Sequence, residues 1–135
     1  MKDKIELKII SIDGKIIEDS VDEIYFDIPL SGVTGILPNR TPFAALLHIG
    51  IFYTKSNNQV KYYCISGGTL EFKNKKALIL ADTIEEQSEL DKERILERKR
   101  IAEEKLKLCT NENDETYENA LFSLKKAINR LKLLK

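Results

Sequence analysis

One unusual stretch of the sequence, SGVTGILPNRTP at residues 31–42, is rich enough in glycine and proline to be tested first as a phosphate-binding loop. It holds two of the six glycines and two of the three prolines, and Arg40 is its only charged residue. Glycine-rich loops can bind phosphate through backbone N–H groups at the start of a helix. This stretch has no lysine and no helical pattern after it, so it lacks the parts of a P-loop. It predicts instead an exposed excursion between strands, where rigid β domains often carry contact surfaces.

Other residues suited to catalysis or metal binding are sparse. His48 is the only histidine, and its apolar neighbours predict a structural role at the edge of a core. Cys64 and Cys109 are far apart and match no metal spacing, so we expect free thiols in a reducing compartment. Gly67 and Gly68 follow a strand-like run, where a tight turn or a bulge is expected. These patterns favour a binding or mechanical module over an enzyme.

The composition argues against several classes of partner. Lys and Arg number 22, as do Asp and Glu, so the formal net charge is zero and nothing indicates general affinity for nucleic acid. The longest apolar runs are far shorter than the roughly 20 residues that cross a bilayer. The first ten residues alternate apolar and charged side chains, which is typical of a strand and unlike a signal or transit peptide.

Residues 1–84 and residues 85–135 have different patterns. All glycines and prolines lie in the first part, where short runs of alternating or β-branched residues are separated by turn signals. The runs are 5–9, 16–17, 21–28, 49–54, 60–66, 70–72 and 77–80, with turns expected at 13–14, 56–58 and 73–75. Many short strands at this spacing predict an all-β sandwich or a flattened barrel.

The second part predicts two helices. Asp91 is the expected N-cap of a helix that ends near Leu108, Ser88 is a competing entry signal, and a second helix starts at Glu115. The second helix has a clear apolar stripe, made of Tyr117, Ala120, Leu121, Leu124, Ile128 and Leu131. The first has a thinner one, made of Ile95, Ala102, Leu106 and Cys109. In an antiparallel hairpin the two stripes cover each other, which leaves little apolar surface to hold the hairpin on the β part. We therefore expect a mobile hairpin.

Four short motifs, in this order along the chain, resemble those of a known family. Residues 32–42 resemble the loop E-G-E-x-G-I-L-P-N-H-A-P, and residues 66–71 resemble the hairpin S-G-G-x-L-E-V. Residues 80–83 resemble the strand exit L-A-D-x-A-E, and residues 90–94 resemble the helix entry I/L-D-x-x-R-A. From end to end the chain is similar to the epsilon subunit of the F-type ATP synthase, bacterial type.

The resemblance implies an N-terminal flattened ten-stranded β-sandwich at 1–84, which binds the gamma subunit and the c-ring. A C-terminal antiparallel two-helix hairpin at 85–135 would be regulatory. The implied function is that of a non-catalytic central-stalk subunit of the rotor, which couples ion-driven rotation of the c-ring to ATP synthesis through gamma. In an extended state the hairpin would contact the alpha and beta subunits and inhibit ATP hydrolysis. The implied location is peripheral, at the cytoplasmic face of the cell inner membrane, without insertion into the bilayer.

The resemblance also assigns residues to contacts. The c-ring-facing loop would contain Ser31, Gly32, Val33, Thr34 and Arg40, and the gamma-facing or structural turn would contain Gly67, Gly68 and His48. No obligatory cofactor is implied. Some members of the family bind ATP at the hairpin, and the matching residues for a weak regulatory ATP site are Glu85, Asp91, Arg94, Lys126 and Arg130. The chain departs from those members at Ile95, Ile101, Asn119 and Lys126, and from the family's acidic loop positions at Ser31 and Val33. Arg40 replaces the usual histidine.

Two other functions stay open on the sequence. A free-standing adaptor protein would keep the β-sandwich and the charged hairpin, but it would recruit a different protein and have no motor role. An enzyme on a β-sandwich is disfavoured by the single histidine and the missing metal spacing. Co-purification with gamma, and loss of coupling after deletion of residues 1–83, would favour the rotor subunit.

Overall fold

The computed structural model describes residues 3–28, 32–109, 111 and 114–134. It consists of two compact units, Met1–Gln87 and Ser88–Lys135. The division falls after Gln87 rather than after residue 84, because the short strand β8 (Ile84–Glu86) pairs with a strand of the first unit. Each unit is described separately below.

The first unit is a β-sandwich built from one continuous sheet. Its other strands are β1 (Ile5–Ser11), β2 (Ile16–Val21), β3 (Glu23–Ile28), β4 (Gly32–Ile36), β5 (Phe43–Ser56), β6 (Gln59–Lys73) and β7 (Lys76–Ala81). The strand order is β2-β1-β7-β6-β5-β3-β4, and β8 pairs with β6. Neighbouring strands are antiparallel except β1 and β7, which are parallel. The order leaves β2 and β4 at the two ends of the sheet.

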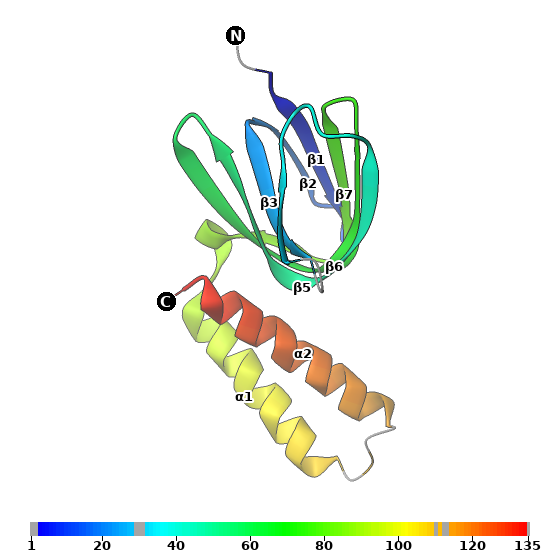
Figure 1. Cartoon of the computed structure of the whole chain (residues 1–135). Helices are drawn as coiled ribbons and strands as arrows, with labels where there is room; N and C mark the ends of the chain where they lie inside the picture. Colours follow the sequence, from blue (N-terminus) through cyan, green and yellow to red (C-terminus); the bar gives the residue numbers. More distant parts are fainter. Residues whose placement is uncertain (1–2, 29–31, 110, 112–113, 135) are drawn as a thin grey trace. The chain divides into compact units, whose positions relative to one another are not determined.

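Two long strands, β5 and β6, fold this sheet into two layers (Figure 1). In β6, Leu70 and Phe72 face the core in one half, and Tyr63 and Ile65 face it in the other, so the inward alternation changes phase between them. The prediction of ten strands is wrong for the described residues, which form eight. The difference arises because β5 and β6 each run through the bend without interruption, whereas counting their halves separately would give ten.

The strands form where the sequence alternates between apolar and polar side chains. In β1 the side chains of Ile5, Leu7 and Ile9 are buried while the residues between them are more exposed, as the period of two predicts. One hydrophobic core lies between the layers. Its largest fully buried side chains are Tyr63, Phe52, Phe72, Ile5, Leu7, Ile9, Ile24, Ile36, Leu70 and Ile79.

The turns predicted between strands are confirmed where the chain needs positive φ. Asn57 and Asn58 (φ 51° and 67°) link β5 to β6, and Asn74 and Lys75 (φ 51° and 62°) link β6 to β7. Two consecutive residues with positive φ make the hairpin turn whose twist matches that of the strands. Gly14 has φ 91° in the turn between β1 and β2.

The predicted run at 21–28 is not one strand, because it breaks at Asp22. The backbone N–H of Asp22 donates to Lys55 O (2.8 Å), so the chain leaves β2 and enters β3 in the other layer. The carboxylate is held by Lys4 Nζ (2.8 Å) and by the backbone N–H of Asn57 (3.1 Å). These contacts link three parts of the chain at one end of the sandwich.

The second unit contains α1 (Lys92–Leu108) and α2 (Glu115–Lys132). Asp91 is the N-cap of α1, and its side chain accepts a hydrogen bond from the backbone N–H of Arg94 (3.3 Å). Asp114 caps α2 in the same way, accepting from the N–H of Thr116 (3.0 Å). The competing entry signal, Ser88, lies instead in the short 3-10 turn η1 (Gln87–Glu89). The predicted N-cap at Asp91 is confirmed.

Small residues lie where α1 and α2 pack side by side (Figure 1). Ala102 of α1 and Ala120 and Ala127 of α2 are buried, and small side chains allow two helix backbones to approach closely. The predicted stripe of α2 is wrong at Ile128, which is 41% exposed. Because an α-helix has 3.6 residues per turn, Ala127 lies on the same face as Ala120, two turns further on, and is the buried residue instead.

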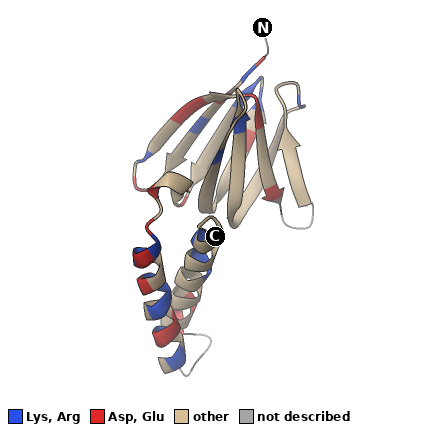
Figure 2. Ribbon diagram, turned by 90° about the vertical axis from the view of Figure 1, so that its left-hand side faces the viewer, with Lys and Arg blue, Asp and Glu red and all other residues tan. Residues whose placement is uncertain are grey.

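The outer surface of α1 is covered by charges of both signs (Figure 2). Arg100 donates to Glu97 Oε1 (2.6 Å) and to Glu104 Oε1 (2.6 Å), which are the spacings that pair on one helix face. The hydrogen bond from Arg100 lowers the pKa of Glu97, and the same pairing raises the pKa of Arg100. Such a helix is supported in water by its own surface pairs.

Candidate functional site

Residues 32–36 of the stretch 31–42 form a strand at the end of the sheet, so the described part of the stretch is not a single loop. Gly32, Val33 and Thr34 belong to β4, which among the described strands pairs only with β3. Ser31 lies outside the described residues. The side chain of Val33 is 68% exposed, so β4 offers an apolar side chain beside a strand edge with which no described strand pairs. An edge of this kind is a common place for a partner chain to bind.

The predicted loop residues do not all lie together. Gly32 pairs with Ile28 and Ile36 with Ile24, so β4 runs the length of β3. At about 3.3 Å per residue, Val33 lies roughly 13 Å along the chain from Leu37. Arg40 follows in the next turn, where its backbone N–H donates to Leu37 O (3.1 Å). Its guanidinium lies over the ring of Phe43, with Cζ 4.3 Å from the centroid, which holds one exposed cation at the start of β5.

Gly67 and Gly68 lie inside β6, so of the two alternatives expected from the sequence, a tight turn and a bulge, the tight turn is wrong. Their φ angles are 111° and 144°, and the backbone N–H of Asp82 donates to Gly67 O (3.0 Å). A Cβ on Gly68 would lie 2.1 Å from Leu80 O. These glycines allow β6 to bend while β7 and β8 continue along it in one register.

His48 is exposed on β5, opposite the bend of β6, which corrects its expected place at the edge of a core. Leu47 pairs with Gly68 and Ile49 with Ser66, so His48 stands across from Gly67. Leu47 faces the core here, and its neighbour therefore points outward. The three residues assigned to the gamma-facing contact, Gly67, Gly68 and His48, thus lie next to one another.

A ladder of three tyrosines crosses the outer face of the second layer, and the sequence analysis missed it. Tyr25, Tyr53 and Tyr62 are neighbours in register, with ring centroids 5.0 Å and 5.4 Å apart. The Tyr25 hydroxyl donates to Glu23 Oε1 (2.6 Å), and this bond to the carboxylate raises the pKa of Tyr25. Each tyrosine stood in a predicted strand, but the cross-strand register that joins them cannot be read from one strand alone.

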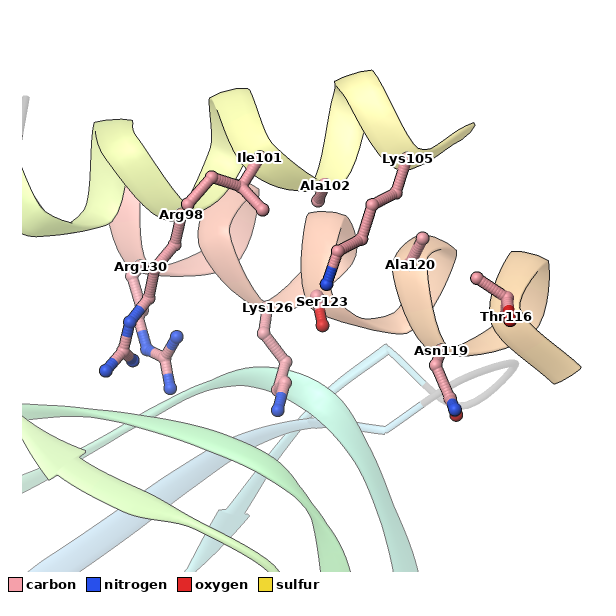
Figure 3. Close-up of a pocket in the computed structure, with 10 residues that line it drawn as sticks. All are labelled: Arg98, Ile101, Ala102, Lys105, Thr116, Asn119, Ala120, Ser123, Lys126 and Arg130. Atoms are coloured by element: carbon pink, nitrogen blue, oxygen red, sulfur yellow. The ribbon is translucent and has the colours of Figure 1, made fainter. Parts of the chain in front are cut away.

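The hairpin carries a groove of about 400 Å³ between α1 and α2 (Figure 3). Lys126 and Arg130, both predicted for an ATP site, line it. Two further cations of α1 that were not predicted, Arg98 and Lys105, line it as well. Figure 3 shows the charged ends of Arg98, Lys126 and Arg130 on the same side of the helix pair. No carboxylate is among the described lining residues, so the groove is suited to an anion.

The other residues predicted for ATP lie elsewhere. Asp91 and Arg94 are at the start of α1 and do not line the groove, and Asp91 accepts the capping hydrogen bond instead. Glu85 belongs to β8 in the first unit. Ile101 and Asn119, which replace basic residues of the ATP-binding members, line the groove. The sequence thus named two of the four cations that line the groove, Lys126 and Arg130, and did not indicate the two of α1.

Neither a metal centre nor a membrane span is found in the described part of the chain. No group of three or more potential ligands among His, Cys, Asp and Glu could hold a metal ion there. Among the described helices, none has the length and apolar character needed to cross a bilayer. Cys64 is buried and Cys109 half-buried, and neither forms a disulfide within the described residues.

Comparison with known proteins decides the family. A family model described as "ATP synthase, Delta/Epsilon chain, beta-sandwich domain" matches residues 4–87. The "ATP synthase epsilon chain" of Bacillus licheniformis is 35% identical over 94% of this chain and 95% of its own length. That of Caldicellulosiruptor bescii is also 35% identical, over 95% and 91%. The chain belongs to the ATP synthase epsilon-chain family.

Solved structures agree with the epsilon-chain fold. A chain of the mitochondrial ATP synthase of Euglena gracilis, in a structure of OSCP/F1/c-ring, superposes with a TM-score of 0.79 at 20% identity. The match covers 98% of this chain and 82% of that one. A chain of the central stalk/c-ring structure from Tetrahymena thermophila gives a TM-score of 0.59 at 10% identity, over 99% and 98%. At these identities the likeness concerns the fold, which extends over both the β-sandwich and the helices of this epsilon-family chain.

Proposed function

We propose that this chain is the non-catalytic central-stalk subunit of an F-type ATP synthase rotor. In this function it holds the gamma subunit to the c-ring, so that ion-driven rotation of the ring reaches the catalytic head. The observation that carries the proposal is the 35% identity to epsilon chains over 94% of this chain, which includes both units. The proposed location is peripheral, on the cytoplasmic face of the membrane that contains the ring.

Within this function, the sandwich is the coupling part. We assign the c-ring contact to the end strand β4, with Gly32, Val33 and Thr34, and to the Arg40 turn. The position of β4 at the end of the described sheet and the exposed Val33 side chain support this assignment. The gamma contact is assigned to the bend, at His48 and the glycines Gly67 and Gly68. Loops and edges set on a rigid sandwich suit such contacts, because the core fixes their positions.

The hairpin is the regulatory part of the proposal. It forms its own compact unit, and α1 is supported by surface ion pairs such as those of Arg100 with Glu97 and Glu104. A helix pair of this kind can keep its fold in more than one position. We propose that in an extended state it contacts the alpha and beta subunits and inhibits ATP hydrolysis, so that a shift between two states sets the hydrolysis rate.

Truncation after Gln87 is expected to raise ATP hydrolysis without loss of coupling. The cut falls at the boundary of the two units, so the sandwich keeps β8 and its core. The measurement is ATPase activity of the catalytic head reconstituted with gamma and either the full chain or residues 1–87. Proton- or sodium-driven ATP synthesis in vesicles with the whole complex is the second readout.

The outcomes of the truncation experiment distinguish inhibition by the hairpin from the rotor function of the whole chain. Equal hydrolysis rates for the full and the truncated chain would reject inhibition by the hairpin and leave the coupling role. Failure of the full chain to bind the head or to restore synthesis would reject the rotor function and favour a free-standing adaptor.

We further propose that the hairpin groove binds the phosphates of ATP weakly, as a regulatory ligand. Four cations line the groove, and two of them, Lys126 and Arg130, match positions of the ATP-binding members. The groove departs from those members at Ile101 and Asn119, while Arg98 and Lys105 bring positive charge from α1. Lysine at position 126 offers a point charge rather than a planar fork, which supports a weak site.

Lys126→Ala is expected to weaken ATP binding about tenfold, the size of one charge-assisted hydrogen bond. Lys125→Ala is the matched control, because it removes the same charge from the next residue of α2, which does not line the groove. Binding is measured by NMR titration of the full chain with ATP. Equal weakening by the two substitutions would indicate a general charge effect and contradict a site in the groove.

A further inference from the structure

The groove of the hairpin has positive charge on both of its walls. Arg98 and Lys105 line it from α1, and Lys126 and Arg130 line it from α2. Residues four or seven apart on a helix lie on the same face, so each helix presents a pair of cations to the groove. Figure 3 shows the charged ends of Arg98, Lys126 and Arg130 on one side of the helix pair. An anion bound there would be held by both helices.

The four cations are spread along the groove rather than gathered at one point. At about 1.5 Å per residue, Arg98 and Lys105 are roughly 10 Å apart along α1, and Lys126 and Arg130 are roughly 6 Å apart along α2. One phosphate group carries about −1.5 to −2 charges near pH 7 and cannot reach cations at both ends of such a row. A chain of linked phosphates places negative charge at successive positions. The spacing therefore suits a phosphate chain better than a single small anion.

Uncharged donors of α2 lie between and beyond the cations. Thr116, Asn119 and Ser123 line the groove, and their hydroxyl and amide groups can donate hydrogen bonds to phosphate oxygens. The guanidinium of an arginine can donate two parallel hydrogen bonds to one phosphate, which adds geometric fit to charge. The polar lining is thus complementary to phosphate along the length of the groove.

The groove offers little that would distinguish one nucleobase from another. Proteins recognise a base by hydrogen bonds to its edge, and they often stack it on an aromatic ring. None of the described lining residues is aromatic, and the apolar ones are Ile101, Ala102 and Ala120. Backbone groups within a helix bond to one another, so they are not available to a base edge. An arginine plane can also stack on a base, but such stacking accepts every base.

We propose that the groove recognises a phosphate chain and not the base, so that ATP, GTP and inorganic tripolyphosphate bind with similar affinity. The inference rests on the regulatory site proposed above and names its class of ligand. It also makes Arg98 a phosphate-binding residue, which with Lys105 supplies positive charge where Ile101 and Asn119 have none. The hairpin then responds to phosphate-rich anions in general rather than to ATP alone.

The test is an NMR titration of the full chain with ATP, GTP, inorganic tripolyphosphate and adenosine, at fixed ionic strength and without divalent metal. The dissociation constants of the three anions should agree within about threefold, and adenosine should leave the groove signals unchanged. Arg98→Gln should weaken all three anions about tenfold, the size of one charge-assisted hydrogen bond. Arg98 is exposed, so this change removes no core packing. Lys99→Gln is the control, because it removes one positive charge from the next residue of α1, which does not line the groove.

The outcomes distinguish the inference from the proposed functions. Binding of ATP more than about tenfold tighter than that of GTP and tripolyphosphate overturns the inference and leaves a regulatory ATP site standing. Binding of adenosine as tight as that of ATP also overturns it, because the nucleoside would then account for recognition. Equal weakening by Arg98→Gln and Lys99→Gln indicates general attraction to positive charge and overturns it as well. Absence of binding by all three anions overturns the ATP site together with the inference and leaves the rotor function standing.

Discussion

Replacing Gly68 with alanine is expected to lower the free energy of unfolding of the sandwich by about 4 kcal/mol. Gly68 has φ 144°, which an L side chain rarely adopts, and its Cβ would lie 2.1 Å from Leu80 O and 3.0 Å from Ala81 Cα. Both atoms belong to the backbone of β7, with which Gly68 pairs. The clash therefore cannot be relieved by moving a side chain and must open the β6–β7 ladder.

Substitutions at two other glycines distinguish the backbone conformation from the steric clash as the cause of this loss. Gly14→Ala also places a side chain at positive φ (91°), but nothing lies within 4 Å of the new Cβ, so a loss of about 1 kcal/mol is expected. Gly50→Ala has neither problem and should be close to neutral. Urea unfolding is followed by near-ultraviolet circular dichroism, because four of the five tyrosines belong to the first unit. If Gly14→Ala costs as much as Gly68→Ala, backbone conformation rather than the clash is responsible.

Phe52→Ala is expected to cost about 4 kcal/mol of sandwich stability. Phe52 is fully buried, and its ring stacks between those of Phe26 (4.8 Å between centroids) and Tyr63 (4.9 Å). Removing it leaves a cavity between two rings held on separate strands, β3 and β6, which cannot close around it without shifting the sheet. Phe52→Leu should cost about 1.5 kcal/mol, because it keeps most of the volume and loses the ring stacking.

The neighbouring residue provides the control for Phe52. Tyr53 lies between Tyr25, on which its ring stacks, and Tyr62, to which its ring is tilted by 40°, on the same three strands but on the outer face, where it is half-buried. Tyr53→Ala should therefore cost only about 1 kcal/mol, since water can fill the space. Thermal and urea unfolding of both variants give the comparison. Similar losses at the two positions would mean that ring stacking, and not burial, accounts for the stability.

Local features of the fold could be predicted from the sequence because they depend on neighbouring residues. The period of two in β1 predicted the buried Ile5, Leu7 and Ile9, and Asp91 was predicted as the helix cap that it is. The hairpin turn at Asn57 and Asn58 follows from residues that tolerate positive φ. In each case the energy that decides the structure lies within a few residues.

Features that depend on distant parts of the chain could not be predicted in this way. The Gly67-Gly68 pair signals a turn locally, but its tertiary role is to bend a strand that stays paired with β7 and β8. His48 has apolar neighbours in sequence, yet it faces outward because the alternation of β5 places Leu47 in the core. The parallel pairing of β1 with β7 joins segments about 70 residues apart, for which no local pattern exists.

The hairpin groove likewise combines residues that local sequence places together with residues that only tertiary packing brings near. Lys126 and Arg130 are four residues apart on α2, so helix geometry alone places them together. Arg98 and Lys105 join them only through the packing of α1 on α2, which depends on the buried positions of Ala102, Ala120 and Ala127. The ring-facing and gamma-facing assignments rest on the resemblance, and the structure supplies their surroundings, the edge of β4 and the bend of β6.

The two strands that run through both layers also determine how the sandwich responds to force. In a sandwich of two separate sheets, side-chain packing alone resists sliding of one layer over the other. Here β5 and β6 join the layers through covalent backbone, and Gly67 and Gly68 allow β6 to turn between them. Shear between the layers must therefore deform two peptide chains and the ladder between them. In the proposed rotor function, this covalent link would let the sandwich pass a force from one layer to the other through its backbone.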